Sequence, residues 1–280
     1  MKIASNPSST LTLNDGNAMP QLGLGVFQIN DVGECIAAVQ CALDAGYRHI
    51  DTAVGYRNEE QVGEAIAQSS VDRDQVFLTT KLGPKQFGAE ACRSCVEESL
   101  SKLRTDYIDL YLIHWPVREK TEETYETLQQ LREEGKVRSI GVSNFTIRRF
   151  EEQFFKRIEE MPAVNQVERH PYHANNELLD YCREKGIQTE AYSPLAQAGA
   201  LDDSSLLEIA NAHGKSVAQV MIRWQLQQGV VVIPKSANPK RIRENANVFD
   251  FQLSDEEMKQ IAGLDRQESI ITWRPEENWF

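Results

Sequence analysis

Short apolar runs alternate with longer amphipathic stretches along most of the chain. The apolar runs have the length and the Val, Ile and Leu content of buried strands, and the stretches between them repeat apolar residues at helical spacing. Glycine ends several helical stretches, as at Gly46, Gly135 and Gly186. This alternation predicts βα units and a parallel sheet. The predicted strands are residues 22–25, 49–51, 76–81, 108–114, 139–143, 163–168, 188–192 and 230–234. The clearest predicted helices are residues 34–43, 90–103, 124–134 and 177–185.

About eight βα units close a (β/α)8 barrel, so the predicted class is α/β with this TIM-barrel architecture. A β-hairpin is expected before the first barrel strand. Residues 11–13 alternate, residues 14–16 read Asn-Asp-Gly, and residues 19–22 supply the second strand.

Two helical patterns are expected outside the repeat. One lies within residues 204–228 and is broken near Gly214, and the other begins with a capping box formed by Ser254 and Glu257. The chain shows no low-complexity segment and no linker rich in Pro, Gly and Ser. Residues 1–280 are therefore expected to form a single domain.

Length and composition agree with a barrel enzyme and narrow its partners. A chain of 280 residues is ordinary for one α/β barrel, and 41% hydrophobic with 26% charged residues is typical of a globular protein. No apolar run approaches the ~20 residues needed to span a bilayer, and the N-terminus lacks the apolar stretch of a signal peptide. The net charge of −12 disfavours nucleic acid and anionic lipid as partners. We expect a cytoplasmic monomer.

The five cysteines do not form a recognisable framework, because their number is odd and their spacing irregular. Cys92 and Cys95 form a CxxC, but it has no second pair and no nearby His to complete a zinc site. We expect incidental thiols on a partly exposed surface helix and no metal.

Polar side chains lie where the predicted strands end, and a barrel enzyme gathers its site at the carboxyl ends of its strands. Each has an ordinary structural alternative: Asp51 as a helix cap, Lys81 as a strand-end side chain that reaches solvent, His114 as a core histidine. Their shared position on one rim favours a functional site. The residues are Asp51, Tyr56, Lys81, His114, Trp115, Ser143, Asn144, Asn165, Gln166, Glu168, Tyr192, Ser193, Lys235 and Ser236.

Four of these residues suit the reduction of a carbonyl group. The developing alkoxide needs a proton, which Tyr56 can donate. A free tyrosine has a pKa near ~10, and an ammonium such as Lys81 is expected to lower it. Asp51 can hold Lys81 charged and oriented, and His114 can hydrogen-bond the carbonyl oxygen.

A basic cluster stands out in this acidic chain. The segment KSANPKRIREN carries Lys235, Lys240, Arg241 and Arg243, and Pro239 is placed to open a helix whose N-terminus favours a phosphate. Arginine pairs with phosphate through two parallel hydrogen bonds, so the cluster favours NADPH over NADH. The alternative is a solvated helix face.

The chain resembles the aldo-keto reductase family over nearly its whole length. The shared motifs are LNDGNAMPQLGLGVFQ, GYRHIDTA, TTKL, DYIDLYLIHWP, IGVSNF, VNQVERHP, AYSPL and IPKSANPKRIRENANVFDF. The resemblance implies a barrel closed at its base by the hairpin, and NAD(P)H-dependent reduction of aldehydes and ketones. It assigns the catalytic tetrad to Asp51, Tyr56, Lys81 and His114.

The resemblance also implies a cofactor path. The nicotinamide carboxamide would be held by Ser143, Asn144 and Gln166, with Tyr192 stacked on the ring. Ser193 and Leu195 would line the pyrophosphate path. The adenosine end would be held by Lys235, Ser236, Asn238 and Arg241 at the 2′-phosphate and by Glu244 and Asn245 at the adenine.

Short loops after His114 and Tyr192 imply an open pocket, as in microbial members that reduce small dicarbonyls and keto-sugar acids such as 2,5-diketo-gluconate. Its substrate wall would include His114, Phe27, Trp115 and Val54, with Trp273 either over the mouth or anchoring the tail.

Three rival interpretations are weaker. A Rossmann dehydrogenase would need GxGxxG, and the segment from Gly23 to Gln28 lacks the third glycine. Tyr181 and Lys185 match the YxxxK of short-chain dehydrogenases without its glycine-rich turn. A cofactor-binding regulatory protein of the same fold is the remaining alternative, and the complete tetrad disfavours it.

Overall fold

Eight parallel strands, each paired with the next in chain order, form the centre of the computed structural model, which describes residues 4–117 and 120–271. The first and last strands meet through bridges from Leu22 to Val232 and from Gly25 to Lys235, so the sheet closes into a barrel. A Cβ at Gly25 would lie 2.9 Å from the Ile233 carbonyl oxygen, and glycine therefore permits the close approach at this seam. The strands are β3 Leu24–Gly25, β4 His49–Asp51, β5 Phe77–Leu82, β6 Ile108–Ile113, β7 Val137–Ser143, β8 Val164–Glu168, β9 Gln188–Tyr192 and β10 Val231–Val232.

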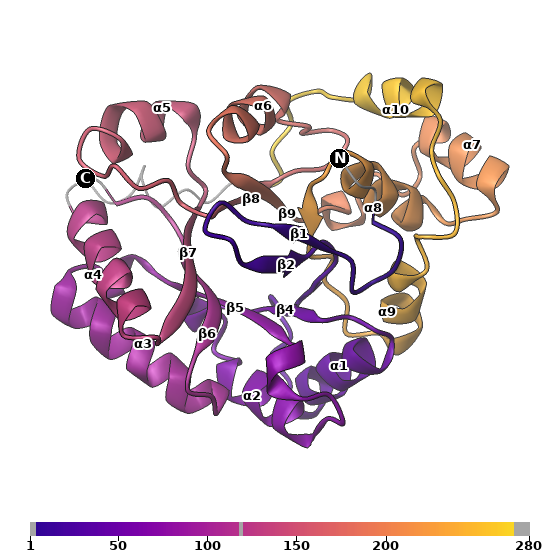
Figure 1. Cartoon of the computed structure of the whole chain (residues 1–280). Coiled ribbons are helices and arrows are strands. Elements are labelled where there is room, and N and C mark those ends of the chain that lie inside the picture. The colour runs from indigo at the N-terminus through magenta and orange to yellow at the C-terminus, as the bar shows by residue number, and fades with distance from the viewer. Residues whose placement is uncertain (1–3, 118–119, 272–280) are drawn as a thin grey trace.

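Helices surround this barrel and confirm the predicted (β/α)8 architecture (Figure 1). Several begin with a side-chain cap that satisfies free backbone N–H groups, as where Asp31 accepts from the Glu34 amide. The helices of the repeat are α1 Val32–Asp44, α2 Glu59–Gln68, α3 Ala89–Leu103, α4 Thr121–Glu133, α5 Ile147–Arg149, α6 Asn176–Glu184, α8 Val217–Gln227 and α9 Pro239–Ala246. The short α5 continues into a π-helical turn at Phe150–Phe154, which the sequence pattern did not predict.

The predicted hairpin is present as antiparallel β1 (Thr10–Thr12) and β2 (Ala18–Pro20). It lies across one end of the barrel in Figure 1. Leu13 and Met19 pack in one apolar cluster with Phe77, Val164 and Val231, which stand where their strands begin. The hairpin therefore closes the amino-terminal end, and the carboxyl-terminal end is left for a site.

The two helical patterns expected outside the repeat are also confirmed. The stretch after β9 breaks at Gly214, which takes φ 60°, between α7 (Ser204–His213) and α8. The other is α10 (Asp255–Ala262), where Ser254 and Glu257 form the expected capping box. Helices α7, α8 and α10 bury a second apolar cluster beside the barrel.

The two cysteines of the CxxC were expected on a partly exposed surface helix. They do lie on a helix, but the expected exposure of their thiols is wrong. Cys92 and Cys95 lie on the face of α3 that packs against the barrel, and both are buried. Burial raises the pKa of Cys92 to about 12 and that of Cys95 to about 11, so neither forms a reactive thiolate at neutral pH. Within residues 4–117 and 120–271, no group of His, Cys, Asp and Glu side chains could hold a metal ion.

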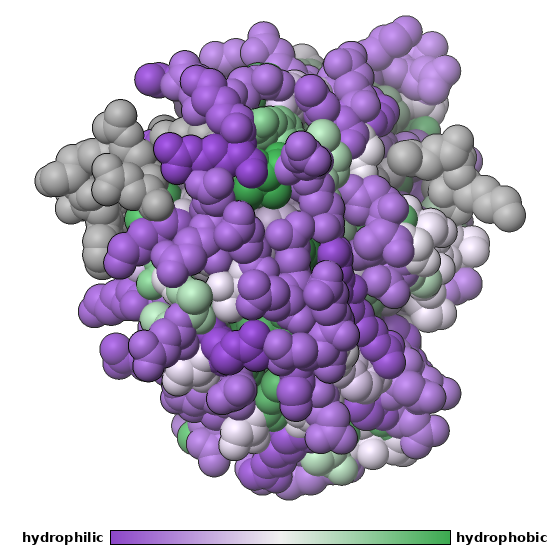
Figure 2. Space-filling view, turned by 60° about the vertical axis from the view of Figure 1, so that its left-hand side comes forward, coloured by the Kyte–Doolittle hydropathy of each residue, from purple (hydrophilic) through white to green (hydrophobic). Residues whose placement is uncertain are grey.

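The face shown in Figure 2 carries mainly hydrophilic side chains, with small scattered apolar patches. In the described part of the chain, no helix has both the length and the apolar character needed to cross a membrane.

Close packing of neighbouring strands leaves no room for a Cβ at Gly141 of β7. A Cβ there would lie 2.6 Å from the Val164 carbonyl oxygen and 2.7 Å from a Leu112 methyl carbon. We predict that Gly141→Ala lowers the free energy of unfolding by about 1–3 kcal/mol, as overpacking does, measured by urea denaturation. The matched control is Gly33→Ala in α1, where the nearest atom is an Asp31 oxygen 3.5 Å away. The control should leave stability unchanged or slightly higher, and equal losses in the two variants would contradict the steric explanation.

Candidate active site

A cavity of about 580 Å³ opens at the carboxyl ends of the barrel strands. Many of the predicted site residues line it, among them Asp51, Tyr56 and His114. The complete lining is Gly25, Phe27, Gln28, Asp51, Tyr56, His114, Trp115, Asn144, Gln166, Tyr192, Ser193, Pro194, Leu195, Gln197, Ile233, Lys235, Ile270 and Ile271.

A buried ion pair stands at the floor of this cavity. Lys81 on β5 is fully buried, and its Nζ donates to Asp51 Oδ1 at 2.6 Å and to Oδ2 at 2.8 Å. The third donor reaches the Thr52 carbonyl oxygen at 2.8 Å. Although burial opposes the charge, the Asp51 carboxylate raises the pKa of Lys81 above its ordinary value. The ammonium therefore stays charged.

Tyr56 ends a short 3-10 turn, Val54–Tyr56, that follows β4. Its ring centroid lies 5.0 Å from Lys81 Nζ and 5.7 Å from the His114 ring. Burial raises the pKa of Tyr56, and the opposing effect of the Lys81 charge only reduces that rise. The net lowering expected from the sequence is therefore wrong, because desolvation of the phenolate outweighs the ammonium. Tyr56 holds its proton at neutral pH.

His114 follows β6 and faces Tyr56 across the cavity. Burial, together with the Lys81 charge, lowers the pKa of His114 to about 3. The imidazole is therefore neutral over the physiological range, with one N–H donor available in the tautomer that faces a ligand. Asn144 Nδ2 donates to the His114 carbonyl oxygen at 2.9 Å and holds this backbone in place.

The residues assigned to the nicotinamide carboxamide form one hydrogen-bonded group. Ser143 Oγ donates to the Gln166 carbonyl oxygen at 2.8 Å, and Asn144 Nδ2 donates to Ser143 Oγ at 3.1 Å. Tyr192 OH donates to Asn144 Oδ1 at 2.8 Å. Asn144, Gln166 and Tyr192 line the cavity, with buried Ser143 behind them.

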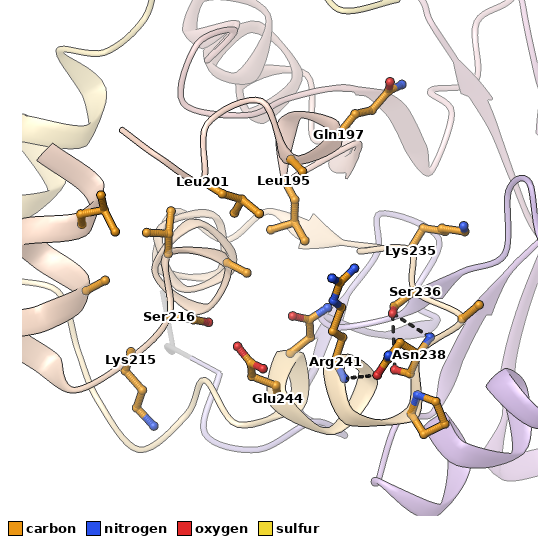
Figure 3. Close-up of a pocket in the computed structure, with 18 of the residues that line it drawn as sticks. Leu195, Gln197, Leu201, Lys215, Ser216, Lys235, Ser236, Asn238, Arg241 and Glu244 are labelled. Carbon is orange, nitrogen blue, oxygen red and sulfur yellow. Dashed lines mark hydrogen bonds between the residues drawn. The ribbon is translucent and has the colours of Figure 1, made fainter. Parts of the chain in front are cut away.

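A second cavity, of about 970 Å³, continues from the first. Leu195, Gln197 and Lys235 line both, so the two form one track across the rim of the barrel. Figure 3 shows this second cavity between the loop that carries Leu195 and helix α9. Seven predicted cofactor residues line it: Leu195, Lys235, Ser236, Asn238, Arg241, Glu244 and Asn245.

Helix α9 begins at Pro239 as the sequence predicts, and Asn238 caps it. Asn238 Oδ1 accepts from the Lys240 and Arg241 amides at 2.9 and 3.2 Å. Figure 3 shows the Arg241 side chain projecting from this helix into the cavity. Of the four-residue basic cluster, Lys235 and Arg241 line the cavity, and Lys240 and Arg243 do not. A capped helix N-terminus with Arg241 in its first turn, and with Lys235 on the same cavity wall, suits a phosphate group.

Besides Lys81 and Ser143, which are buried behind the cavity wall, three residues predicted for the rim or the substrate wall line neither cavity. Val54 packs against the barrel core instead of lining the substrate wall. Asn165 turns its amide toward Phe145, to whose carbonyl oxygen it donates at 2.9 Å. Glu168 holds a tail segment. Trp273 lies outside the described residues.

Some cavity residues were not predicted from the sequence, namely Gln28, Ile233, Gln197, Ile270 and Ile271. Ile233 lies near the end of the predicted strand 230–234, so the rule that site residues follow strand ends could have identified it. The isoleucines at 270 and 271 could not, because their place depends on a fold-back of the tail.

Glu168 anchors that tail segment. Its carboxylate accepts from Ser269 Oγ at 2.6 Å, from the Ile270 amide at 2.7 Å and from His170 Nε2 at 2.9 Å. Burial would raise the pKa of Glu168, but these hydrogen bonds outweigh it and hold the pKa below its ordinary value. The anchored segment carries Ile270 and Ile271 to the cavity wall.

The closed eight-stranded barrel, with a polar site at its carboxyl end and an extended cavity beside it, defines the class of barrel enzymes. Solved structures agree. An aldo-keto reductase from a Medee basin deep-sea metagenome library, MGS-M4, superposes with a TM-score of 0.91 at 42% identity, covering 94% of this chain and 97% of that one. The aldose reductase of Schistosoma japonicum gives 0.90 at 38% identity, covering 94% of each chain.

Sequence comparison specifies the family. Residues 21–266 match the sequence model described as the aldo/keto reductase family. The glyoxal reductase of Bacillus subtilis (strain 168) is 48% identical over 261 residues, which are 93% of this chain and 94% of the relative. The methylglyoxal reductase DkgA of Escherichia coli (strain K12) is 44% identical over 266 residues, 94% of this chain and 95% of the relative. The chain belongs to the aldo-keto reductase family of oxidoreductases.

We predict that Glu168→Gln frees the tail segment, because an amide cannot accept at both of its ends. Deuterium uptake at the Ile270 amide should rise at least about fivefold over wild type at neutral pH, as the loss of one charge-assisted hydrogen bond implies. In the wild type, protection of the Ile270 amide relative to its intrinsic exchange rate at the same pH should fall by the same factor only on acidification below the ordinary glutamate range, since the stability from a lowered pKa disappears as the carboxylate is protonated. Unchanged protection in the variant would show that the segment is held by other contacts.

Proposed function

We propose that this protein reduces small aldehydes and ketones to alcohols with NADPH, with Tyr56 as the proton donor. One observation carries the proposal. The ring of Tyr56 lies between a buried Lys81–Asp51 ion pair and a neutral His114, in a cavity that continues into a second one lined by Lys235 and Arg241.

The site residues divide the work of the reaction among them. The bound cofactor would supply the hydride that reaches the carbonyl carbon. His114 donates a hydrogen bond to the carbonyl oxygen and orients it beside Tyr56. Tyr56 gives its phenolic proton to that oxygen as negative charge develops there, and the Lys81 ammonium stabilises the phenolate left behind. Asp51 keeps Lys81 charged and in place.

The cofactor residues fit the groups that NADPH presents along the track. Ser143, Asn144 and Gln166 would hold the nicotinamide carboxamide, with Tyr192 against the ring. Leu195 lies where the two cavities join and Ser193 lines the first of them, so both would lie along the pyrophosphate path. The 2′-phosphate would meet Lys235, Ser236, Asn238 and Arg241, and the adenine would lie near Glu244 and Asn245. An ionised phosphate needs such charged and hydrogen-bonding partners, which an NADH site would not require.

The substrate wall supports small, compact carbonyls. Phe27, Trp115, Ile270 and Ile271 give it an apolar character around the polar pair of Tyr56 and His114. Two relatives are named for glyoxal and methylglyoxal reduction. We therefore propose small dicarbonyls as the first substrates to test, followed by keto-sugar acids and by aromatic and aliphatic aldehydes.

Tyr56→Phe should remove nearly all reduction because it deletes the donated proton. We predict a fall in kcat of at least about 10²–10⁴-fold, the range for loss of a general acid, with NADPH affinity close to wild type. The measurements are NADPH oxidation with methylglyoxal and a fluorescence titration of NADPH. The matched control is Tyr181→Phe on α6, the tyrosine of the YxxxK pattern, whose OH bonds Glu151 on the surface. Activity that survives in Tyr56→Phe would exclude Tyr56 as the acid. Tight NADPH binding by the wild type, with no turnover across the carbonyl panel, would instead favour a regulatory protein.

Arg241→Ala should distinguish the two cofactors, because only NADPH carries the 2′-phosphate. We predict that the Kd for NADPH rises about 10–100-fold, the value of one or two charged hydrogen bonds, with NADH affinity nearly unchanged. Arg243→Ala is the control, since it removes the same charge from the same helix at a position outside the cavity. Equal losses for both cofactors would place Arg241 away from the phosphate.

A further inference from the structure

A second carboxyl group lies inside the barrel beneath the cavity floor. Glu190 on β9 is fully buried, and no step of the reaction described above uses it. Gln166 Nε2 donates to Glu190 Oε2 at 2.9 Å and to Asp51 Oδ2 at 2.8 Å. Carboxyl groups from β4 and β9 thus occupy both N–H donors of one amide on β8.

This arrangement fixes which end of the Gln166 amide faces the cavity. A side-chain amide has a donor end and an acceptor end, and a rotation of 180° about its terminal bond exchanges them. In the rotated form, the Gln166 carbonyl oxygen would face the ionised Asp51 carboxylate and lose that hydrogen bond, and it would keep a partner at Glu190 only if that carboxyl turned a proton toward it. With the nitrogen held inside the barrel, the carbonyl oxygen remains as the acceptor of this cavity-lining side chain.

We propose that Glu190 is a positioning residue: together with Asp51 it clamps the Gln166 amide, so that Gln166 presents an acceptor oxygen to the carboxamide of a nicotinamide cofactor. The proposal rests on the proposed function, because it assumes that such a cofactor binds in this cavity.

The charges around Glu190 make its carboxyl group a suitable clamp. Burial, with the Asp51 charge, raises the pKa of Glu190 to about 8. The groups that face it are Asp51 and His49 from β4, Lys81 from β5, and Tyr56 above them. His49 is neutral, because burial and Lys81 lower its pKa to about 3, and its Nε2 stands 3.6 Å from Glu190 Oε1. A protonated Glu190 accepts from Gln166 without adding a second negative charge beside Asp51.

A double-mutant cycle tests whether Glu190 acts through Gln166. Glu190→Met removes the acceptor at similar length, Glu190→Gln retains an acceptor oxygen, and each is combined with Gln166→Met. We expect Glu190→Met alone to weaken NADPH binding roughly five- to tenfold, as for one lost hydrogen bond and a mobile amide. In the Gln166→Met background the same change should alter binding less than about twofold, and Glu190→Gln alone should stay within about twofold of wild type.

A second ligand distinguishes a loss of Gln166 positioning from general damage to the cofactor cavity. Adenosine 2′,5′-bisphosphate carries the phosphates and adenine without nicotinamide, so its affinity should not change in any Glu190 variant. Thr189→Val is the matched control, because it is a buried, similar-sized change one residue away on β9, where side chains alternate between the faces of the sheet. If Glu190→Met does not fold, Glu190→Asp, which withdraws the acceptor by one methylene, takes its place in the cycle.

Two results would overturn the proposal: an unchanged NADPH affinity in Glu190→Met, or an equal fold-loss with and without Gln166. Both are read against a wild type that binds NADPH and reduces methylglyoxal. If the wild type binds no nicotinamide cofactor, the result would instead contradict the proposed function itself.

Discussion

The buried ion pair between Lys81 and Asp51 is the interaction on which the site depends. Taking two charges out of water costs several kcal/mol per ion, which the pair recovers only with good geometry and satisfied hydrogen bonds. Here both carboxylate oxygens, the Thr52 carbonyl and the Gln166 amide complete the shells of the two ions. Loss of either partner would leave an uncompensated charge inside the barrel, so the pair and the closed barrel around it stabilise each other.

The same burial sets the protonation states of Tyr56 and His114, the two groups proposed to meet a carbonyl. It raises the pKa of Tyr56, which keeps its proton, and it lowers the pKa of His114, which stays neutral. Both are hydrogen-bond donors in those states. The Lys81 ammonium opposes the rise at Tyr56 and becomes most favourable once the phenolate forms. Burial and charge thus act in opposite directions on one tyrosine, and the proposed role of Tyr56 as a proton donor that later regains its proton draws on both.

Polar residues extend from the site into the barrel interior rather than ending at its rim. Gln166 joins the Asp51–Lys81 pair to Glu190, which approaches His49 one layer deeper. An apolar cluster around Leu13 and Met19 then fills the end closed by the hairpin. The interior of the barrel is therefore polar toward the cavity and apolar toward the hairpin. The polar side chains hold one another in place by hydrogen bonds, and the apolar core stays buried at the other end.

The amino-acid sequence by itself determined the strand and helix order, the hairpin, the α9 start at Pro239 and the rim position of Asp51, Lys81 and His114. These features follow from short-range patterns: hydrophobic period, turn residues, caps and the alternation of βα units. A parallel barrel brings the carboxyl ends of its strands together, so the order of the strands along the chain is enough to place strand-end residues on one rim.

Only the tertiary structure decided what each side chain meets there. The sign of the Tyr56 pKa shift depends on how far burial outweighs the Lys81 charge, which no local pattern contains. The burial of Cys92, the exclusion of Val54 from the cavity and the arrival of Ile270 from the tail depend on contacts between distant segments. Local sequence determines the position of a residue along its own helix or strand. Packing between elements determines how far its side chain is buried, which charges lie near it and whether it reaches the cavity.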